Sequence, residues 1–203
     1  MELIFATHNA HKLEEIREAV PDFVKVMSLF DMGFSGEIPE TGTTLAENAS
    51  QKSRYVKERF GADCFADDTG LIVDALGGAP GVYSARYAGE NASYDDNVEK
   101  LLRALNGRND RKARFCTVIS LLLDGREYFF EGTVEGRILE ERRGEGGFGY
   151  DPVFMPDGFD RTFAQMSLDE KGLISHRGRG LKGPGGMLAA LIMADFLARY
   201  GKE

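Results

Sequence analysis

Two adjacent carboxylates, Asp67 and Asp68, interrupt what otherwise looks like a buried strand, and they constrain the fold more than any other feature of the sequence. They follow the apolar run Cys64-Phe65-Ala66, and a second apolar run, Leu71-Ile72-Val73, begins after Thr69 and Gly70. An uncompensated charge in a buried strand is costly, so the pair requires a counter-charge, for which Mg2+ is a candidate. A solvated turn is the alternative, because Asp, Thr and Gly also favour turns. From this segment alone the two interpretations are about equally supported.

The composition is typical of a globular protein. A chain of 203 residues with 42% hydrophobic residues is long enough for one sizeable core, which two lobes can share. The net charge of −8 argues against non-specific nucleic-acid binding. No apolar run approaches the ~20 residues of a membrane span, and the first residues do not resemble a signal peptide. Cys64 and Cys116 lie in apolar, strand-like runs, which favours buried free thiols and a reducing cytoplasm.

The order of the predicted elements indicates an α/β fold with a mixed sheet. Strands interleave with helices in the first part of the chain, and a hairpin with an Asp124-Gly125 turn follows later. Asn9, Ser93 and either Thr43 or Thr44 are expected to cap helices. The predicted strands cover residues 3–7, 24–27, 113–123 and 127–139, and the predicted helices cover residues 9–20, 43–60, 93–107 and 187–200, with a loop over 31–43 and a glycine–proline break at 183–186.

The junction between the first strand and the first helix is polar and ends in a lysine. It consists of Thr7, His8, Asn9, Ala10, His11 and Lys12. A lysine in the first turn opposes the helix dipole, but it becomes favourable when a phosphate binds at the same N-terminus. The glycines and the Lys-Ser/Thr pair of a Walker A loop are missing. Taken alone, Lys12 is more often a surface lysine than a phosphate ligand.

A second polar segment, Glu40-Thr41-Gly42, precedes the helix that carries Asn48 and Lys52. Asn48 and Lys52 are four residues apart and therefore share a helix face, which adjoins the apolar face. A helix surface with ion pairs is the commoner interpretation of such residues, and ligand binding is the alternative.

Two later segments combine glycines, aromatic rings and hydrogen-bond donors. The first, residues 144–152, includes Phe148, Gly149, Tyr150 and Asp151. Its glycines permit close approach to a ligand and its rings can stack on a nucleobase, which favours a ligand site slightly over a flexible loop. The second, residues 171–178, includes Lys171, His176 and Arg177. Its donors suit a keto oxygen or a phosphate, although taken alone a basic loop tip is the simpler interpretation.

These segments belong to six motifs that follow one another from Thr7 to Arg177. The motifs are Thr7-x-Asn9-x-x-Lys12, Glu40-Thr41-Gly42 with Glu47-Asn48-Ala49, Ala66-Asp67-Asp68-Thr69-Gly70-Leu71, Leu76-Gly77-Gly78-Ala79-Pro80-Gly81-Val82-Tyr83-Ser84-Ala85-Arg86, Gly146-Gly147-Phe148-Gly149-Tyr150-Asp151-Pro152 and Ser175-His176-Arg177-Gly178. In this order they resemble the motifs of the Ham1-like nucleoside triphosphate pyrophosphatases.

The resemblance implies a single Ham1-like domain over residues 1–203, an α/β fold with a mixed central sheet, flanking helices and two lobes around an active-site cleft. It implies Mg2+-dependent hydrolysis of ITP, dITP and XTP to a monophosphate and pyrophosphate, by a cytoplasmic homodimer without nucleic-acid or membrane partners. Carried over by motif, Glu40 and Asp68 would bind the metal, and Asp68 would be the general base. The triphosphate would contact residues 7–12, Lys52 and Thr69, and the base would contact residues 148–151, Lys171, His176 and Arg177.

Three alternatives stay open at this level. A Maf-like pyrophosphatase would act on pyrimidine or modified nucleotides instead. A nucleotide-binding regulator would bind without turnover, although the complete set of Glu40, Asp67 and Asp68 argues against such a role. Because a metal-bound carboxylate is a weak base, Asp68 would orient a metal-bound hydroxide in a further variant of the mechanism.

Overall fold

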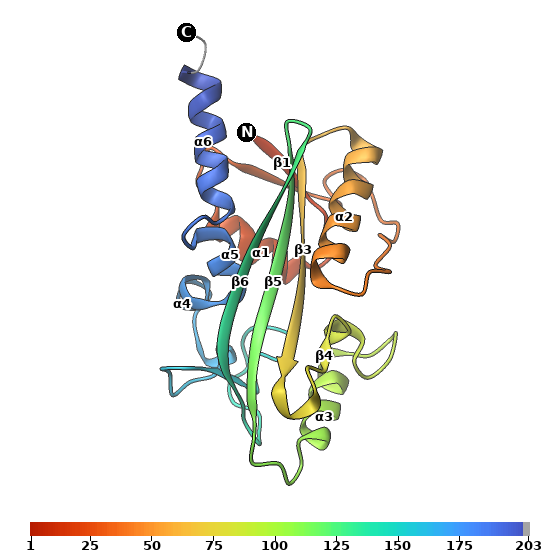
Figure 1. The fold of residues 1–203 in the computed structure, drawn as a ribbon, viewed down its shortest axis with the longest axis vertical. Coiled ribbons are helices and arrows are strands. Elements are labelled where there is room, and N and C mark those ends of the chain that lie inside the picture. The colour runs from red at the N-terminus through yellow and green to blue at the C-terminus, as the bar shows by residue number, and fades with distance from the viewer. Residues whose placement is uncertain (201–203) are drawn as a thin grey trace. The chain divides into compact units, whose positions relative to one another are not determined.

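The computed structural model describes residues 1–200 and divides the chain into two compact units. Unit 1 comprises Met1–Asp68, Thr117–Gly132 and the chain from Arg177 onward, and unit 2 comprises Thr69–Cys116 and Thr133–His176. Three strands, β3 (Cys64–Val73), β5 (Lys112–Leu123) and β6 (Arg126–Ile138), contribute residues to both units (Figure 1). The two units agree with the two lobes expected from the sequence.

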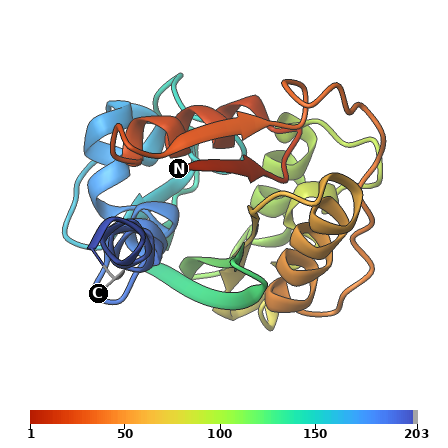
Figure 2. The ribbon, with the colours of Figure 1, turned by 90° about the horizontal axis from the view of Figure 1, so that it is seen from above.

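The sheet of unit 1 begins with two parallel strands, β2 (Lys25–Ser28) and β1 (Glu2–Phe5). Glu2 lies opposite Lys25, and on its other side β1 pairs in parallel with β3, where Ile4 lies opposite Cys64. The β5 and β6 strands follow in the order β2-β1-β3-β5-β6. Helix α1 (Ala10–Ala19) lies beside β2 (Figure 2), and the unit also holds α2 (Leu45–Phe60), most of α5 (His176–Lys182) and α6 (Met187–Tyr200).

Alternation along the strands gives unit 1 two hydrophobic cores, one on each face of its sheet. Leu3, Phe5 and Phe65 pack with residues of α1, α5 and α6, whereas the residues next to them in sequence, Ile4 and Ala66, pack with residues of α2. Successive side chains of a strand point to opposite faces, so a strand that is apolar at every position must be covered on both sides. The continuous apolar runs in the sequence therefore reflect helices on both faces of this sheet.

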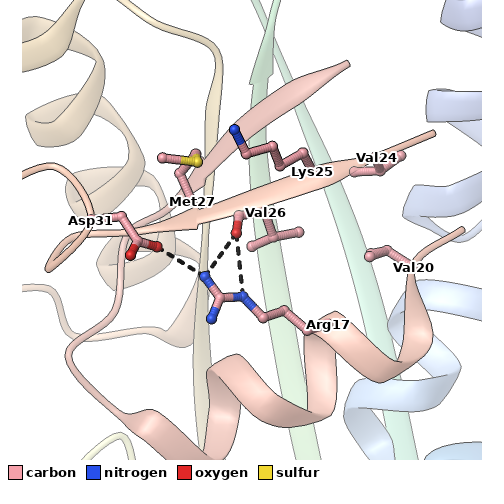
Figure 3. Close-up of a pocket in the computed structure, with 7 residues that line it drawn as sticks. All are labelled: Arg17, Val20, Val24, Lys25, Val26, Met27 and Asp31. Carbon is pink, nitrogen blue, oxygen red and sulfur yellow. Dashed lines mark hydrogen bonds and ion pairs between the residues drawn. The ribbon is translucent and has the colours of Figure 1, made fainter. Parts of the chain in front are cut away.

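The ion pair between Arg17 and Asp31 hydrogen-bonds the outer edge of the edge strand β2 (Figure 3). Nε and Nη2 of Arg17, on α1, donate to the carbonyl oxygen of Val26 over 3.3 and 3.0 Å. The carboxylate of Asp31 accepts from Nη2 of Arg17 over 2.9 Å and from the backbone N–H of Ser28 over 2.8 Å. Unpaired groups of an edge strand invite pairing with another chain, and these bonds occupy them.

Unit 2 is built around a single hydrophobic core. Its part of the sheet has the order β4-β3-β5-β6-β7, in which β4 (Pro80–Gly81) is antiparallel to β3 and β7 (Phe154–Pro156) is antiparallel to β6. Helix α3 (Tyr94–Ala104) contributes Val98 and Leu101 to the core. Parallel pairs in unit 1 and antiparallel pairs in unit 2 confirm the predicted mixed sheet.

Most of the predicted elements are confirmed, and the elements that were missed are short. Asn9, Thr44 and Ser93 cap α1, α2 and α3, and Asp124-Gly125 turns between β5 and β6 with positive φ at both residues. The short strands β4 and β7 and the helices α4 (Leu168–Ile174) and α5 were not predicted. Elements of two to seven residues are too short for a periodic signal, although α4 has a local capping box formed by Ser167 and Glu170.

No apolar run as long as a membrane span was expected from the sequence, and the C-terminal segment differs from this expectation. His176–Arg199, which covers α5, the bend at residues 183–186 and α6, is long and apolar enough by length and composition to cross a membrane, and 22% of its most apolar window is buried. Two features are those of a helix segment packed on a folded unit. Arg177 is buried in ion pairs near its start, and Leu181, Met187 and Leu191 belong to a core of unit 1.

Candidate active site

Asp67 and Asp68 lie within β3, not in a turn, and only 2% and 8% of their surfaces are exposed. Because neighbouring residues of a strand point to opposite faces of the sheet, the two carboxylates meet different partners. Asp68 contacts residues of α2, and Asp67 contacts residues of α1 and α5. The alternative of a solvated turn is therefore wrong, and each carboxylate has its own protein counter-charges.

Asp68 is held by two residues of α2. Nδ2 of Asn48 donates to Oδ2 of Asp68 over 3.0 Å, and Nζ of Lys52 lies 3.5 Å from Oδ1. The same ammonium donates to Oε1 of Glu40 over 2.5 Å. Two carboxylates, from β3 and from the loop before α2, therefore converge on one positive charge.

Asn48 also fixes the loop that carries Glu40. Its Oδ1 accepts from the backbone N–H of Gly42 over 2.8 Å, while its Nδ2 holds Asp68. A side chain at position 42 would overlap Asn48, because an added Cβ would lie 2.7 Å from the amide oxygen. The spacing Glu40-Thr41-Gly42 thus brings one carboxylate to Lys52 only if the third residue is glycine.

The electrostatics of this cluster favour a proton-accepting Asp68 and a charged Lys52. Burial, together with the neighbouring Glu40, raises the pKa of Asp68 above its usual range, although Lys52, Lys12 and Asn48 act against this shift. Burial opposes the charge of Lys52 as well, but Asp68 and Glu40 outweigh it and raise the pKa of Lys52. The lysine therefore stays protonated, and Asp68 is more basic than an exposed aspartate.

Asp67 lies in a second charge cluster. Nζ of Lys12 donates to Oδ1 of Asp67 over 2.9 Å, and Nε of Arg177 donates to Oδ2 over 3.0 Å. Nη1 of Arg177 also donates to the carboxylate of Glu15. Burial alone would raise the pKa of Asp67, but Lys12 and Arg177 together hold it far below its usual range. Asp67 is therefore an anion that orients two cations.

The start of α1, beside Lys12, is capped by polar side chains. Oδ1 of Asn9 accepts from the backbone N–H groups of His11 and Lys12 over 3.0 and 3.2 Å, and Oγ1 of Thr7 accepts from that of Asn9 over 3.1 Å. His8, Ala10 and His11 are exposed, whereas Lys12 is largely buried. The interpretation of Lys12 as a surface lysine is therefore wrong.

Unit 2 holds a separate cluster of an ion pair and aromatic rings. Nζ of Lys171 donates to Oδ2 of Asp151 over 2.5 Å, and the same oxygen accepts from the backbone N–H of Phe148 over 2.8 Å. The ammonium lies 4.7 Å from the ring centroid of Phe148 and 5.6 Å from that of Phe163. An added Cβ at Gly147, where φ is +71°, would overlap Asp151, so this turn requires glycine.

Two neighbours complete the cluster of unit 2. The hydroxyl of Tyr150 donates to the carbonyl oxygen of Ser84 over 2.8 Å, which anchors the loop of residues 144–152. The ring of His176 stacks on Phe115 with 4.7 Å between centroids. Lys171 and His176 are buried in or next to helices, so the interpretation of residues 171–178 as a basic loop tip is wrong.

The structure distributes the predicted site residues over these three clusters. Unit 1 brings Glu40, Lys52 and Asp68 together, and it brings Lys12 together with Asp67. Unit 2 brings together Phe148, Asp151 and Lys171, while Gly149 lies in the same loop with φ +61° and half-buried Thr69 follows Asp68 on β3. Arg177, predicted to contact the base, pairs with Asp67 and Glu15 in unit 1.

Two residues of these clusters received no role from the sequence. Glu15 lies three positions after Lys12, and Asn48 lies four positions before Lys52. Both spacings place the two side chains on one helix face. This shared face was the only indication in the sequence that the residues act together. The spacing does not reveal that such a face is buried against carboxylates, because the partners come from distant segments.

Comparisons with known proteins identify the family to which these site residues belong. The model of the Ham1 family matches residues 3–183. A dITP/XTP pyrophosphatase of Christiangramia forsetii is 55% identical over 178 residues, which cover 88% of this chain and 94% of the relative. A dITP/XTP pyrophosphatase of Porphyromonas gingivalis is 51% identical and covers 96% of both chains.

A solved structure shows the same likeness in three dimensions. The Ham1 protein of Staphylococcus aureus superposes with a TM-score of 0.82 at 40% identity, over 96% of this chain and 100% of that one. A Ham1 protein of Coxiella burnetii has a TM-score of 0.81 at 37% identity, over 96% of this chain and 99% of that one. With a family match over most of its length and relatives of this similarity, the chain belongs to the Ham1 family.

Proposed function

We propose that this protein hydrolyses the deaminated purine nucleotides dITP, ITP and XTP to a nucleoside monophosphate and pyrophosphate, which removes them from the nucleotide pool. Relatives that are 45–55% identical carry the name dITP/XTP pyrophosphatase. The convergence of Glu40 and Asp68 on one cation is the observation that carries the proposal, because cleavage of a phosphoanhydride needs concentrated positive charge beside a proton acceptor.

The same convergence fits a divalent metal ion. Lys52 stands between the two carboxylates as a protein cation, which shows that they face a common point. Among residues 1–200 no group of three or more His, Cys, Asp or Glu side chains is close enough to hold a metal. Two carboxylates, with water and phosphate oxygens as the other ligands, are the usual environment of Mg2+. Glu40 and Asp68 would hold it, and it would neutralise charge on the phosphates.

The protein's own residues account for orientation and proton transfer in the proposed reaction. Lys52 and residues 7–12 at the start of α1, Lys12 among them, would bind the triphosphate. Asp68 would hold the attacking water and accept its proton as the water oxygen bonds to the α-phosphorus. The bond from that phosphorus to the bridging oxygen breaks, and pyrophosphate leaves. Burial raises the pKa of Asp68, which favours this role. A metal ion on the same carboxylate would act in the opposite direction and would leave Asp68 to orient the water.

Unit 2 would recognise the base. The ring of Phe148 offers a surface for stacking, and Lys171 offers a donor for the 6-keto oxygen of hypoxanthine or xanthine. Adenine has an amino donor at this position, which would leave donors facing one another. His176 and Arg177 are the further base contacts that we propose from the motifs.

A substrate panel tests the proposal directly. Purified protein is incubated with dITP, ITP, XTP, dATP, dGTP, UTP and dTTP, and the products are identified by chromatography. We expect monophosphate and pyrophosphate from the first three, loss of activity with EDTA and recovery with Mg2+. Diphosphate with orthophosphate would refute the cleavage position, preference for UTP or dTTP would support the Maf-like alternative, and binding without turnover would support a regulator.

We also propose that the protein is a cytoplasmic homodimer. The two free cysteines support a reducing compartment. Light scattering coupled to size-exclusion chromatography should give twice the chain mass of 22.4 kDa, and a monomer mass would refute the dimer.

A further inference from the structure

Four charged side chains of unit 1 form a closed ring that begins and ends on helix α1. Lys12 pairs with Asp67, Asp67 pairs with Arg177, and Arg177 pairs with Glu15. Lys12 and Glu15 are three residues apart on α1, so the helix itself closes the ring. The ring therefore connects Lys12 to Glu15 through two residues from β3 and α5.

The ring is buried and balanced. The side chains of Asp67 and Arg177 are each 1% exposed, and that of Glu15 is 9% exposed. Two cations and two anions alternate along it, so Asp67 and Arg177 each lie between two opposite charges. A buried ion pair is favourable only when its geometry and its remaining hydrogen bonds are satisfied, which makes the position of each member depend on its neighbours.

We propose that Glu15 is a positioning residue that holds the ammonium of Lys12 in place for the triphosphate, acting through Arg177 and Asp67. This inference rests on the proposed function for its substrate, but the contacts that carry it do not. Nη1 of Arg177 donates to Glu15, while Nε of the same guanidinium donates to Oδ2 of Asp67. The other oxygen of Asp67, Oδ1, accepts from Nζ of Lys12.

Without the Glu15 carboxylate, the guanidinium would turn toward Asp67. Arginine has a planar fork that pairs with both oxygens of a carboxylate, and this arrangement is favoured wherever it is accessible. A two-pronged pair with Asp67 would compete for Oδ1 and release Lys12 from its present position. A displacement of about 1 Å in a binding group is enough to cost up to about 10²-fold in rate.

The test compares Glu15→Gln with Glu14→Gln, which removes the same charge from an exposed neighbour on the same helix. With dITP we expect kcat to fall about tenfold in Glu15→Gln, since misplaced groups affect the reacting geometry, and to stay within about twofold of wild type in the control. Melting temperatures show whether Glu15→Gln folds; if it does not, Glu15→Asp, which keeps the charge but is one methylene shorter, is measured instead. Equal activity of Glu15→Gln and Glu14→Gln would overturn the proposal.

A double-mutant cycle separates positioning from general structural damage. Lys12→Arg keeps a cation but changes its reach, so little should remain for Glu15 to position. In that background we expect Glu15→Gln to cost less than about threefold, because residues of one network are not additive. The same loss in both backgrounds would show that Glu15 acts independently of Lys12 and would refute the ring as a relay.

A crystal structure of the folded Glu15 variant gives a readout that needs no turnover. We expect Arg177 to contact both oxygens of Asp67 and Nζ of Lys12 to leave its position 2.9 Å from Oδ1. An unchanged Lys12 would overturn the proposal. If wild type released no pyrophosphate from any substrate, the proposed function would fail, while this structure would still decide on the ring.

Discussion

Unit 1 and unit 2 solve the same problem, a buried charge, in different ways. In unit 1, Asp67 belongs to a ring of four charges, and next to it in sequence Asp68 shares Lys52 with Glu40. In unit 2, one ion pair between Lys171 and Asp151 lies among aromatic rings. The network of unit 1 suits binding of a highly charged group, and the pair of unit 2 suits recognition of a planar, nearly neutral one.

This difference predicts how strongly substitutions in each unit should lower the stability of the protein. Removal of one member of a network leaves its partners as uncompensated charges in a dry environment. An isolated pair can be replaced without this cost, because substituting both members removes both charges together. Stability should therefore respond differently in the two units even when activity falls in both.

The largest effect is expected for Asp67→Asn in the ring of unit 1. Lys12 and Arg177 lose their shared anion, and breaking a buried ion pair costs about 3–5 kcal/mol. The pKa of Asp67 is lowered by Lys12 and Arg177 despite burial, so its contribution is present above its ordinary value of 3.8 and is lost as the pH falls below it.

Thermal melts of wild type and Asp67→Asn between pH 7 and pH 3 check this sign. The difference in melting temperature should be constant down to about pH 4 and shrink below it. A difference that grows on acidification would contradict the lowered pKa and with it the ring.

A smaller effect, mainly on activity, is expected for Asp68→Asn, because Lys52 keeps Glu40 as its counter-charge. The amide keeps the shape but loses the proton acceptor and the proposed metal ligand, so dITP turnover should fall at least about 10²-fold. Circular dichroism should be unchanged. Asn48→Ser serves as a comparison that keeps the carboxylate but removes its amide donor. Near-wild-type turnover of Asp68→Asn at saturating Mg2+ would give Asp68 another role.

The neutral double variant Asp151→Asn/Lys171→Met tests whether unit 2 stays stable when both charges of its buried ion pair are removed. Replacing both members of a buried pair is often close to neutral for stability, so the melting temperature should stay near wild type and above that of Lys171→Met alone. The ratio of dITP to dATP efficiency should fall about tenfold or more, because the donor for the keto group is gone. An unchanged ratio would remove Lys171 from base recognition.

The smallest effect concerns the two thiols, one in each unit. Burial raises the pKa of Cys64 in unit 1 to about 12, whereas Cys116 in unit 2 is partly exposed. Alkylation at pH 8 followed by mass spectrometry should therefore label Cys116 first, since the thiolate is the reactive form. Labelling of Cys64 at the same rate would show that unit 1 opens readily.

Several elements were predictable because their signals are local. The caps Asn9, Thr44 and Ser93 and the turn Asp124-Gly125 all lie where the sequence indicates them. A cap hydrogen bond or a turn conformation involves residues within a few positions of one another, so the sequence contains the whole interaction. The short elements β4, β7 and α5 lack such signals. Helix α4 does have one, the capping box of Ser167 and Glu170, which was not predicted from the sequence.

The candidate site was predictable in its residue types but not in its pairings. Asn48 and Lys52 look like part of a helix surface, and residues 171–178 look like a loop tip. Asn48, Lys52 and the charged or ring side chains Lys171, His176 and Arg177 are nevertheless buried. Whether a polar helix face is solvated depends on what covers it, and a sequence window does not contain that information. The family motifs named these residues, while their partners remained unassigned.

By itself the sequence determined the α/β class, the main helices and strands, the membership of the Ham1 family and the carboxylates around which a site forms. Only the tertiary structure decided that Asp67 and Asp68, adjacent in the chain, belong to different clusters and that Glu15 reaches Asp67 through Arg177. The physical reason is the pleat of β3, which sends neighbouring side chains to opposite faces, where helices from distant parts of the chain supply the counter-charges.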